Sequence, residues 1–295
     1  MSSKTSANIA QVSTPDEIRN VVLVGSSGSG KTTLLEHILR SRITGYRGEK
    51  EDLERTSQMM VAAIPAGEVV VNLLDAPGHP DFVGELRAGL RGADAAVFVV
   101  AAADGIDSAT AALWNECAAV DLPRAIVITK LDDGRTTFDD ALAALQETLG
   151  KSVQPSYAPL EVNGQIAGNI SLVSQRVHDY SSGKVEKRTA TDEEIAIVEA
   201  YRAALIEGII EESEDADLMD RYLEGDVLRT EELVNDLLVA VKNGRFYPVI
   251  PVTSVNGLGT EELLAVIESS FPTPDSHQLD VTTPDGDEAA AEIGN

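Results

Sequence analysis

The amino-acid sequence predicts an α/β fold, in which a doubly wound, mostly parallel sheet carries an inserted α+β subdomain. Short runs of Val, Ile, Leu and Ala without polar breaks alternate with segments of helical periodicity over residues 21–149. Such alternation is typical of buried parallel strands that are connected by helices. It stops near residue 153 and resumes near residue 246, which predicts an insertion between two strands of one sheet.

Each element follows from its own pattern. Residues 21–24, Val-Val-Leu-Val, suit a strand that is buried on both faces. The same reasoning predicts strands at 61–64, 69–74, 94–100, 125–128 and 248–254. Amphipathic spacing predicts helices at 33–41, 81–91, 108–120, 136–149 and 260–269. Within the insertion we expect extended segments at 153–162 and 170–177, and helices at 192–212, 218–223 and 231–241.

These patterns divide the chain into parts. At 295 residues it exceeds one average domain. We expect a flexible N-terminal tail over residues 1–17, a main domain made of 18–152 and 246–274, an inserted subdomain over 153–245, and a flexible acidic tail over 275–295. The tails are assigned because small polar or acidic residues dominate them and cannot bury a core.

Charge excludes one class of partner. Lys and Arg number 23 against 49 Asp and Glu, so the formal net charge is −26. A field of this sign repels phosphodiester backbones, and we expect no direct nucleic-acid binding by this chain. The first 17 residues lack an apolar segment, and no run approaches 18 apolar residues. We therefore expect a cytoplasmic protein without membrane contact.

A phosphate-binding motif joins the first strand to the first helix. The spacing G-x-x-x-x-G-K-[ST] is met by Gly25, Ser26, Ser27, Gly28, Ser29, Gly30, Lys31 and Thr32, and Thr33 follows it. Glycines let the backbone turn its N–H groups toward a phosphate, and the start of the helix adds its positive dipole end. We expect Lys31 to contact the β- and γ-phosphates and the Thr32 hydroxyl to bind Mg²⁺.

Asp75 is the second candidate metal ligand. It follows the strand at 69–74 and opens the segment Asp-Ala-Pro-Gly-His. Proteins with a P-loop of this kind place an acid at the end of such a strand, where it holds magnesium, usually through water. The sequence Asp-Ala-Pro-Gly also suits a turn, but the upstream motif favours the metal.

The loop after the strand at 125–128 points to guanine. The carboxylate of Asp132 can accept hydrogen bonds from N1–H and the 2-amino group of guanine, whereas adenine offers neither donor on that edge. The aliphatic stem of Lys130 can lie along the ring. Thr253 and Ser254 end the last strand of the sheet and can present a backbone N–H to the guanine 6-oxygen.

At this point the chain resembles the translational GTPases, and specifically the elongation factor G group. The resemblance covers roughly residues 18–274 and rests on the segments 25–32, 75–82, 123–132 and 248–274. The segments 218–225 and 230–233 look like the inserted G′ subdomain of that group. Other GTPases lack this insert, so the set of motifs is specific.

The resemblance implies a GTP-binding (G) domain that takes GTP or GDP with Mg²⁺ and hydrolyses GTP. It implies that His79 positions the attacking water, and that Thr33, Gly78 and Thr129 lie in the nucleotide site with the residues above. The implied partner is the ribosome, which the insert touches at its stalk. We expect the chain to be a monomer.

Several residues depart from the family pattern. Thr129 stands where the family has Asn, so we expect the loss of an amide that braces the P-loop. Gly28 stands where the group usually has Asp. The first switch is short, and residues 55–59 offer no secure counterpart of the threonine that closes over Mg²⁺. The relatives continue for several more domains, whereas this sequence stops at Asn295. We expect nucleotide binding to persist and hydrolysis to be slow.

Two other functions remain open at this stage. One is a binding switch, a protein that takes up GTP or GDP and docks on a partner with little or no hydrolysis. The other is an ATP-dependent kinase, which shares the P-loop but leaves Lys130 and Asp132 unexplained. Nucleotide preference separates the kinase from the others, and turnover separates the GTPase from the switch.

Overall fold

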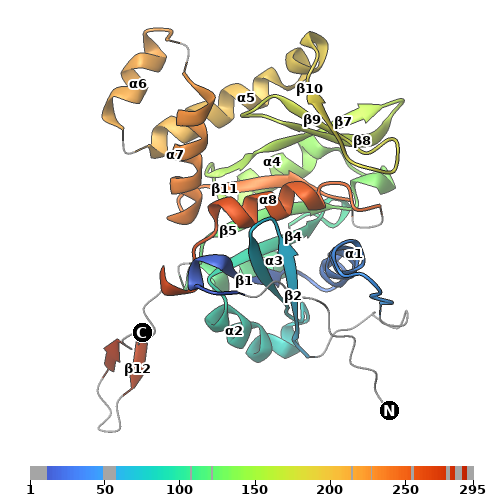
Figure 1. Cartoon of the computed structure of the whole chain (residues 1–295), viewed down its shortest axis with the longest axis vertical. Coiled ribbons are helices and arrows are strands. Elements are labelled where there is room, and N and C mark those ends of the chain that lie inside the picture. The colour runs from blue at the N-terminus through green and yellow to red at the C-terminus, as the bar shows by residue number, and fades with distance from the viewer. Residues whose placement is uncertain are drawn as a thin grey trace.

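The computed structural model describes residues 12–48, 58–106, 108–120, 122–213, 215–226, 228–253, 256–276, 280–282 and 288–290. A large sheet with helices on both sides forms one end of the molecule, and the inserted residues form a second lobe at the other end (Figure 1). The expectations for residues 1–11, for most of the first switch at 49–57 and for Ser254 lie outside the described residues.

The main sheet has seven strands in the order β2, β3, β1, β4, β5, β11, β6. Their bounds are β1 Ile18–Val24, β2 Met60–Ala66, β3 Val69–Asp75, β4 Ala95–Ala101, β5 Arg124–Thr129, β6 Val153–Pro155 and β11 Tyr247–Pro251. Neighbours pair in parallel, except that β2 and β3 form an antiparallel hairpin. The predicted α/β class and mostly parallel sheet are confirmed.

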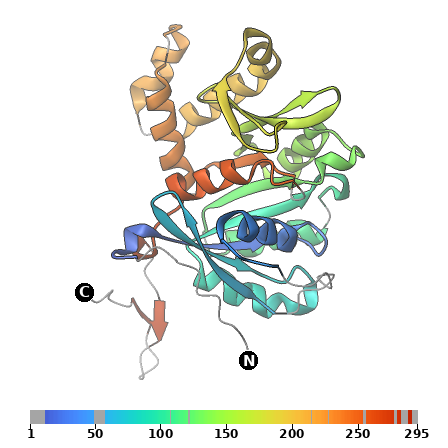
Figure 2. The same cartoon turned by 45° about the vertical axis from the view of Figure 1, so that its right-hand side comes forward.

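Helices cover both faces of this sheet (Figure 2). The helices are α1 Lys31–Arg42, α2 Val83–Gly92, α3 Ser108–Ala118, α4 Phe138–Leu149 and α8 Thr260–Ser270. Alternate side chains of β1 enter different cores: Val21 and Leu23 share one with residues of α1 and α8, whereas Val22 and Val24 share the other with residues of α2, α3 and α4. Period-two alternation along a strand explains this split.

The insert holds a separate four-stranded antiparallel sheet in the order β10, β9, β8, β7. Its strands are β7 Tyr157–Val162, β8 Gln165–Ser171, β9 Arg176–Asp179 and β10 Glu186–Thr189, followed by α5 Asp192–Glu212, α6 Ala216–Leu223 and α7 Thr230–Lys242. Thr191 and Glu194 form a capping box at the start of α5, which satisfies backbone N–H groups that a helix start leaves without partners.

The insert begins later in the chain than its sequence pattern indicates. Residues 153–155 form β6, which pairs in parallel with β11 at the edge of the main sheet, and the extended segment expected at 153–162 breaks at Ser156. The segment expected at 170–177 is likewise divided between β8 and β9. The first break reflects long-range strand pairing, which local periodicity does not encode, and the second is a local turn closed by the Gln175 N–H donating to the Ser171 carbonyl oxygen.

Both segments expected to be tails contain some regular structure. Pro15–Glu17 form a short 3-10 helix, and so do Pro274–Ser276. The strands β12 Asp280–Thr282 and β13 Glu288–Ala290 pair with each other. None of the described helices combines the length and the apolar character that crossing a bilayer requires.

Candidate functional site

The P-loop runs from the end of β1 to the start of α1, as its spacing predicts. Gly25 needs the absence of a side chain, because a Cβ there would collide with the carbonyl oxygen of Val99 in β4. Gly30 caps α1 with φ of 99°, a left-handed conformation that glycine adopts without strain. The loop therefore sits directly against the neighbouring strand and delivers Lys31 and Thr32 to the first turn of the helix.

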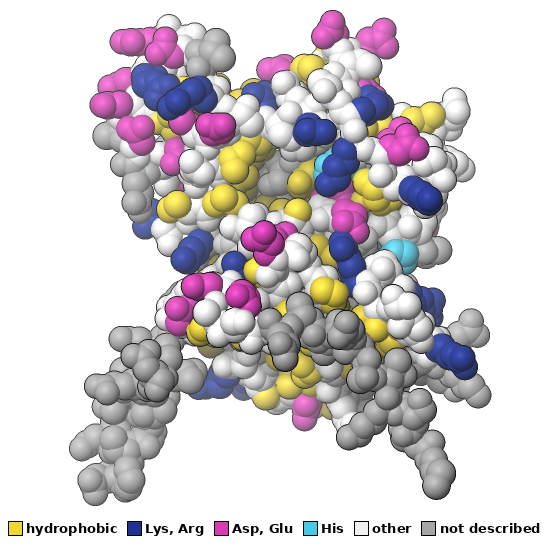
Figure 3. Space-filling view, in the orientation of Figure 1, with side chains coloured by type: hydrophobic (Ala, Val, Ile, Leu, Met, Phe, Trp, Pro, Cys, Tyr) yellow, Lys and Arg dark blue, Asp and Glu magenta, His cyan; other side chains and the backbone are white. Residues whose placement is uncertain are grey.

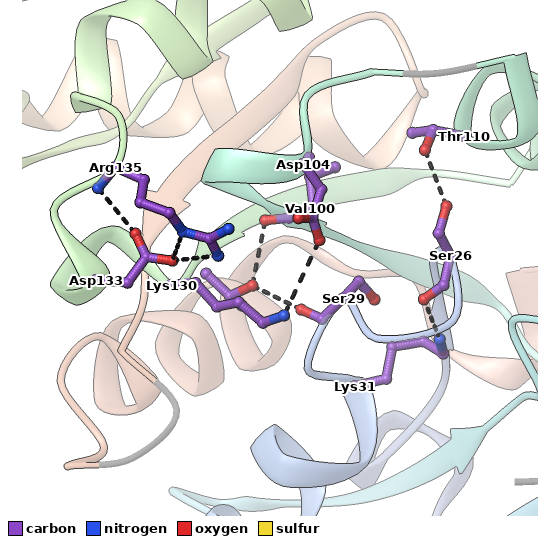
Figure 4. A network of polar contacts seen from close by, with 10 residues as sticks. Ser26, Ser29, Lys31, Val100, Asp104, Thr110, Lys130, Asp133 and Arg135 are labelled. Atoms are coloured by element: carbon purple, nitrogen blue, oxygen red, sulfur yellow. Dashed lines mark hydrogen bonds and ion pairs between the residues drawn. The ribbon is translucent and has the colours of Figure 1, made fainter. Parts of the chain in front are cut away.

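Lys31 is the most strongly perturbed cation of the site. Its ammonium group donates to the carbonyl oxygen of Gly25 over 2.8 Å. It also donates to the carbonyl oxygen of Ser26 over 3.0 Å (Figure 4). Burial lowers its pKa to about 8, and the charge of Asp75 opposes that shift only in part. A Cβ on Gly78 would lie 2.6 Å from Lys31 Nζ, so the segment after β3 packs directly over the lysine.

Thr32 and Asp75 face each other as a polar pair. The Thr32 hydroxyl donates to Asp75 Oδ2 over 2.6 Å, and Asp75 is fully buried at the end of β3. Burial raises the pKa of Asp75, while the Thr32 hydrogen bond and Lys31 lower it by less. Within the described part of the chain, Asp75 Oδ1 has no hydrogen-bond partner. A buried acceptor without a partner beside a threonine hydroxyl suits a hydrated Mg²⁺, so the donor set fits this metal.

Thr129 makes a contact that sequence reasoning expected to be lost. Its hydroxyl donates to the carbonyl oxygen of Ser29 over 2.6 Å and lies 3.3 Å from the carbonyl oxygen of Val100. The residue is fully buried at the end of β5. The family amide is indeed absent, but the threonine hydroxyl still ties β5 to the P-loop.

Lys130 and Asp132 follow Thr129 in the loop after β5. Lys130 adopts a left-handed conformation, with φ of 59°, and its ammonium group lies 3.9 Å from Asp104 Oδ2. Asp132 lies in the short 3-10 helix Leu131–Asp133 and is exposed. It lines a cavity of about 550 Å³ together with Asn256, so the loops after β5 and β11 meet on this side of the site.

The backbone N–H of Thr253 is engaged inside its own loop. It donates to the carbonyl oxygen of Leu258 over 3.0 Å, and the Thr253 hydroxyl donates to Asn256 Oδ1. This N–H therefore has a partner within its own loop. Thr253 and Ser254 both stay predictions for the contact with guanine, and Ser254 lies outside the described residues.

His79 lies at the edge of the site, where it caps the 3-10 helix Pro80–Phe82. Its Nδ1 accepts a hydrogen bond from the backbone N–H of Asp81 over 3.3 Å, and its ring meets Phe82 edge to face. The side chain is 44% exposed. The imidazole thus stands on the surface beside Gly78.

Sequence reasoning missed Asp104 and Thr110, which lie beside the predicted P-loop residues Ser26 and Ser27. The hydroxyls of Ser26 and Thr110 lie 2.9 Å apart, which connects the loop to α3. Ser27, Asp104 and Thr110 help to line a cavity of about 220 Å³. The turn Asp104-Gly105 directly after a buried strand was the available signal, because such strand ends carry the ligand loops of these sheets.

Comparison with known proteins agrees with this geometry. The family model described as "Elongation factor Tu GTP binding domain" matches residues 16–273. Proteins named "Elongation factor G-like protein" from two Mycobacterium tuberculosis strains, CDC 1551 / Oshkosh and ATCC 25618 / H37Rv, are each 46% identical over 287 residues. Those matches cover 92% of this chain and 40% of each relative, so the chain spans 40% of the length of these curated relatives.

A solved structure shows the same fold. The crystal structure of a Thermus thermophilus protein superposes with a TM-score of 0.78 at 34% identity, covering 88% of this chain and 41% of that one. The match of the family model, which includes the insert, is the decisive finding. The chain belongs to the family of elongation factor Tu GTP-binding domains.

Proposed function

We propose that this chain binds GTP and GDP together with Mg²⁺ and hydrolyses GTP slowly on its own. The observation that carries the proposal is the pairing of Thr32 with the buried Asp75 beside Lys31, at the carboxyl ends of β1 and β3. The residues suited to guanine follow β5 at the same edge of the sheet. The ATP-dependent kinase is disfavoured, because adenine lacks the N1–H and 2-amino donors from which Asp132 would accept.

The P-loop would hold the phosphates through its backbone N–H groups and Lys31. Lys31 donates to two loop carbonyls, and a phosphate oxygen is a stronger acceptor than these because it is charged. Thr129 would keep the loop in shape through its bond to Ser29. Asp132 would accept from N1–H and the 2-amino group of guanine.

Thr32 and Asp75 would hold the magnesium ion, Asp75 through water on its unpartnered Oδ1. When bound, the ion neutralises charge on the phosphate oxygens. Gly78 lies against the loop at Gly25 and Lys31, so the chain from Asp75 to His79 is positioned to respond to whatever binds there.

His79 would orient the attacking water. Slow hydrolysis is proposed because orientation of the attacking water, binding of the metal and stabilisation of charge in the transition state act as a unit in such reactions. Here Nδ1 of His79 is engaged with the Asp81 N–H, and the half-exposed imidazole is in contact with solvent. Binding needs only the phosphate, metal and base contacts, so it should survive where catalysis is weak.

We propose the ribosome as the partner, with the insert as the part of the chain that contacts it. In the family that this chain resembles, the insert touches the ribosome at its stalk. The proposed partner follows from the similarity to proteins named elongation factor G-like. We place the protein in the cytoplasm as a monomer and expect no direct nucleic-acid binding. Acidic side chains gather over α6 at the upper left of Figure 3, in keeping with the net charge of −26.

A nucleotide-dependent binding switch is the second candidate. The engagement of His79 with Asp81 and the replacement of the family residue at Gly28 favour it. The test is to purify residues 1–295, titrate GDP, GTP and ATP with Mg²⁺, and follow phosphate release. GDP and GTP binding with slow release supports the GTPase. Binding without release supports the switch, and equal binding of ATP overturns both.

A further inference from the structure

The insert contacts the main domain next to the loop between β11 and α8. Asn169 of β8 is fully buried, and its Nδ2 donates to the carbonyl oxygen of Pro251 over 3.1 Å and to Glu262 Oε1 over 3.3 Å. Pro251 is the last residue of β11, and Glu262 lies in the first turn of α8. One side chain from the insert therefore holds both ends of the β11–α8 loop.

Glu262 depends on the insert for its polar contacts. Its carboxylate is fully buried, and Tyr180 donates to Oε2 over 2.5 Å. His178 Nδ1 lies 3.1 Å from Oε1. Burial raises the pKa of the Tyr180 phenol, which therefore stays a proton donor toward the carboxylate. Because a buried carboxylate is costly without such partners, the position of α8 is coupled to the insert sheet.

The described parts of the β11–α8 loop are closed by their own hydrogen bonds. Thr253 N–H donates to Leu258 O, Gly257 N–H donates to Thr253 O over 2.9 Å, and Leu258 N–H donates to Asn256 Oδ1 over 3.1 Å. A Cβ on Gly259 would collide with the Pro251 carbonyl oxygen, so the loop also packs tightly on the end of β11. Because these hydrogen bonds hold the loop together, its position depends on Pro251 and Glu262, the two residues that Asn169 contacts.

A second contact lies on the same side of the molecule. The hairpin between β7 and β8 contributes Gly164 and Gln165 to the cavity of about 550 Å³ that Asp132 and Asn256 also line. The insert thus forms one wall beside the loops that follow β5 and β11, independently of the buried contact at Glu262.

We propose that Asn169 is a positioning residue for base recognition, through which the insert sheet fixes Asn256, in the described part of the β11–α8 loop, beside Asp132. The inference rests on the proposed nucleotide binding. It also implies that removing the insert would affect the main domain, because Glu262 would lose its contacts with Asn169 and Tyr180.

The test compares GDP and ADP affinities in Asn169→Ala and Tyr180→Phe, with Mg²⁺ present, alongside thermal unfolding. Asn169→Ala should weaken GDP about fivefold, the value of one net hydrogen bond, and leave the weak ADP affinity unchanged. Tyr180→Phe keeps the ring and should shift the ratio in the same direction. Ser171→Ala is the matched control, because Ser171 is buried two residues along the same strand and its hydroxyl bonds only to Ser174 among the described residues.

The GDP-to-ADP ratio separates positioning from stability. An equal loss for both nucleotides would mean that these residues only stabilise the fold, and an unchanged ratio in both variants would also overturn the inference. If the unmodified chain shows no preference for GDP over ADP, the proposed function fails first and the inference fails with it.

Discussion

The hydroxyl of Thr32 donates to Asp75 Oδ2 over 2.6 Å and so joins the first turn of α1 to the last residue of β3. This contact brings together two segments that are 43 residues apart in the chain. The other carboxylate oxygen of Asp75 is buried and has no partner in the described structure. The pair therefore offers a hydroxyl and an acceptor at one place, which is what a hydrated magnesium ion needs.

Asp75→Asn should remove the effect of magnesium on GDP affinity. In the unmodified chain we expect Mg²⁺ to tighten GDP binding by about tenfold or more, or about 1.4 kcal/mol. The substitution keeps the size of the side chain but deletes its charge, so GDP affinity should be the same with Mg²⁺ and with EDTA. Titration with a fluorescent GDP measures this. Asp81→Asn is the control, because that carboxylate is 81% exposed. A full magnesium effect in Asp75→Asn would remove Asp75 from the site.

Lys31 should make GDP affinity depend on pH in a defined direction. Its pKa in the free chain is lowered to about 8, so the amine is charged below that pH and loses its proton above it. Phosphates bind the charged form, so binding above pH 8 must take up a proton. The affinity should be level below pH 8 and fall above it by up to about tenfold per pH unit.

Calorimetry in two buffers of different ionisation enthalpy checks this proton uptake at pH 8, where the guanine N1–H still keeps its proton, and its near-absence at pH 7. Lys31→Ala should bind GDP very weakly and show no such dependence. Lys187→Ala, on the exposed strand β10, should behave like the unmodified chain. Equal heats in both buffers at pH 8 would contradict the role of Lys31.

Thr129→Val should weaken nucleotide binding, whereas Thr129→Ser should preserve it. Valine keeps the shape of threonine but cannot donate to the Ser29 carbonyl, which would then be buried without that bond. The expected cost is about 1–3 kcal/mol of unfolding free energy, with GDP affinity lowered as the P-loop loosens. Denaturant unfolding and GDP titration measure the two effects. Equal affinity in both variants would show that the hydroxyl is not needed.

The main sheet could be predicted because its signals are local. The buried run at 21–24 and the glycine spacing after it required only short-range reasoning, and the helix Asp192–Glu212 begins and ends where its periodicity predicts. Residues 153–155 were assigned to the insert because their place in the main sheet depends on pairing with β11, far along the chain. The contact between Asn169 and Glu262 could not be predicted for the same reason, because it joins residues that are 93 positions apart in the sequence.

The sequence motifs name candidate site residues, but they do not predict the hydrogen bonds among those residues. The sequence motif identified Thr129 as a departure from the family, yet only the fold reveals that its hydroxyl reaches Ser29. Likewise, the sequence names Thr253 as a candidate for base recognition but does not predict that its N–H donates to Leu258. Which of several possible partners a polar group takes is decided by packing, and sequence spacing does not contain that information.

Asp132→Asn should shift base preference from guanine toward xanthine. Xanthine carries an oxygen where guanine has its 2-amino group, so an amide donor suits it and a carboxylate does not. GDP affinity should fall and XDP affinity should rise, and competition against fluorescent GDP measures both. Asp133→Asn is the neighbouring control, because the Asp133 carboxylate is already paired with Arg135. Unchanged discrimination in Asp132→Asn would remove this residue from base recognition.

The isolated chain should release phosphate from GTP more slowly than the roughly 1 s⁻¹ of an ordinary enzyme, and His79→Ala should slow it further while leaving GDP affinity intact. The imidazole is 44% exposed, and its Nδ1 accepts from the Asp81 N–H, so it can reach a water only from its other nitrogen. Single-turnover release with chain in excess over GTP measures the chemical step. Lys31→Ala, purified in the same way, reports any contaminating activity. Release at about 1 s⁻¹ or faster would contradict the proposed slow hydrolysis. Slow release that His79→Ala leaves unchanged would show that the histidine is idle, and the nucleotide-dependent binding switch would then be the better description of this chain.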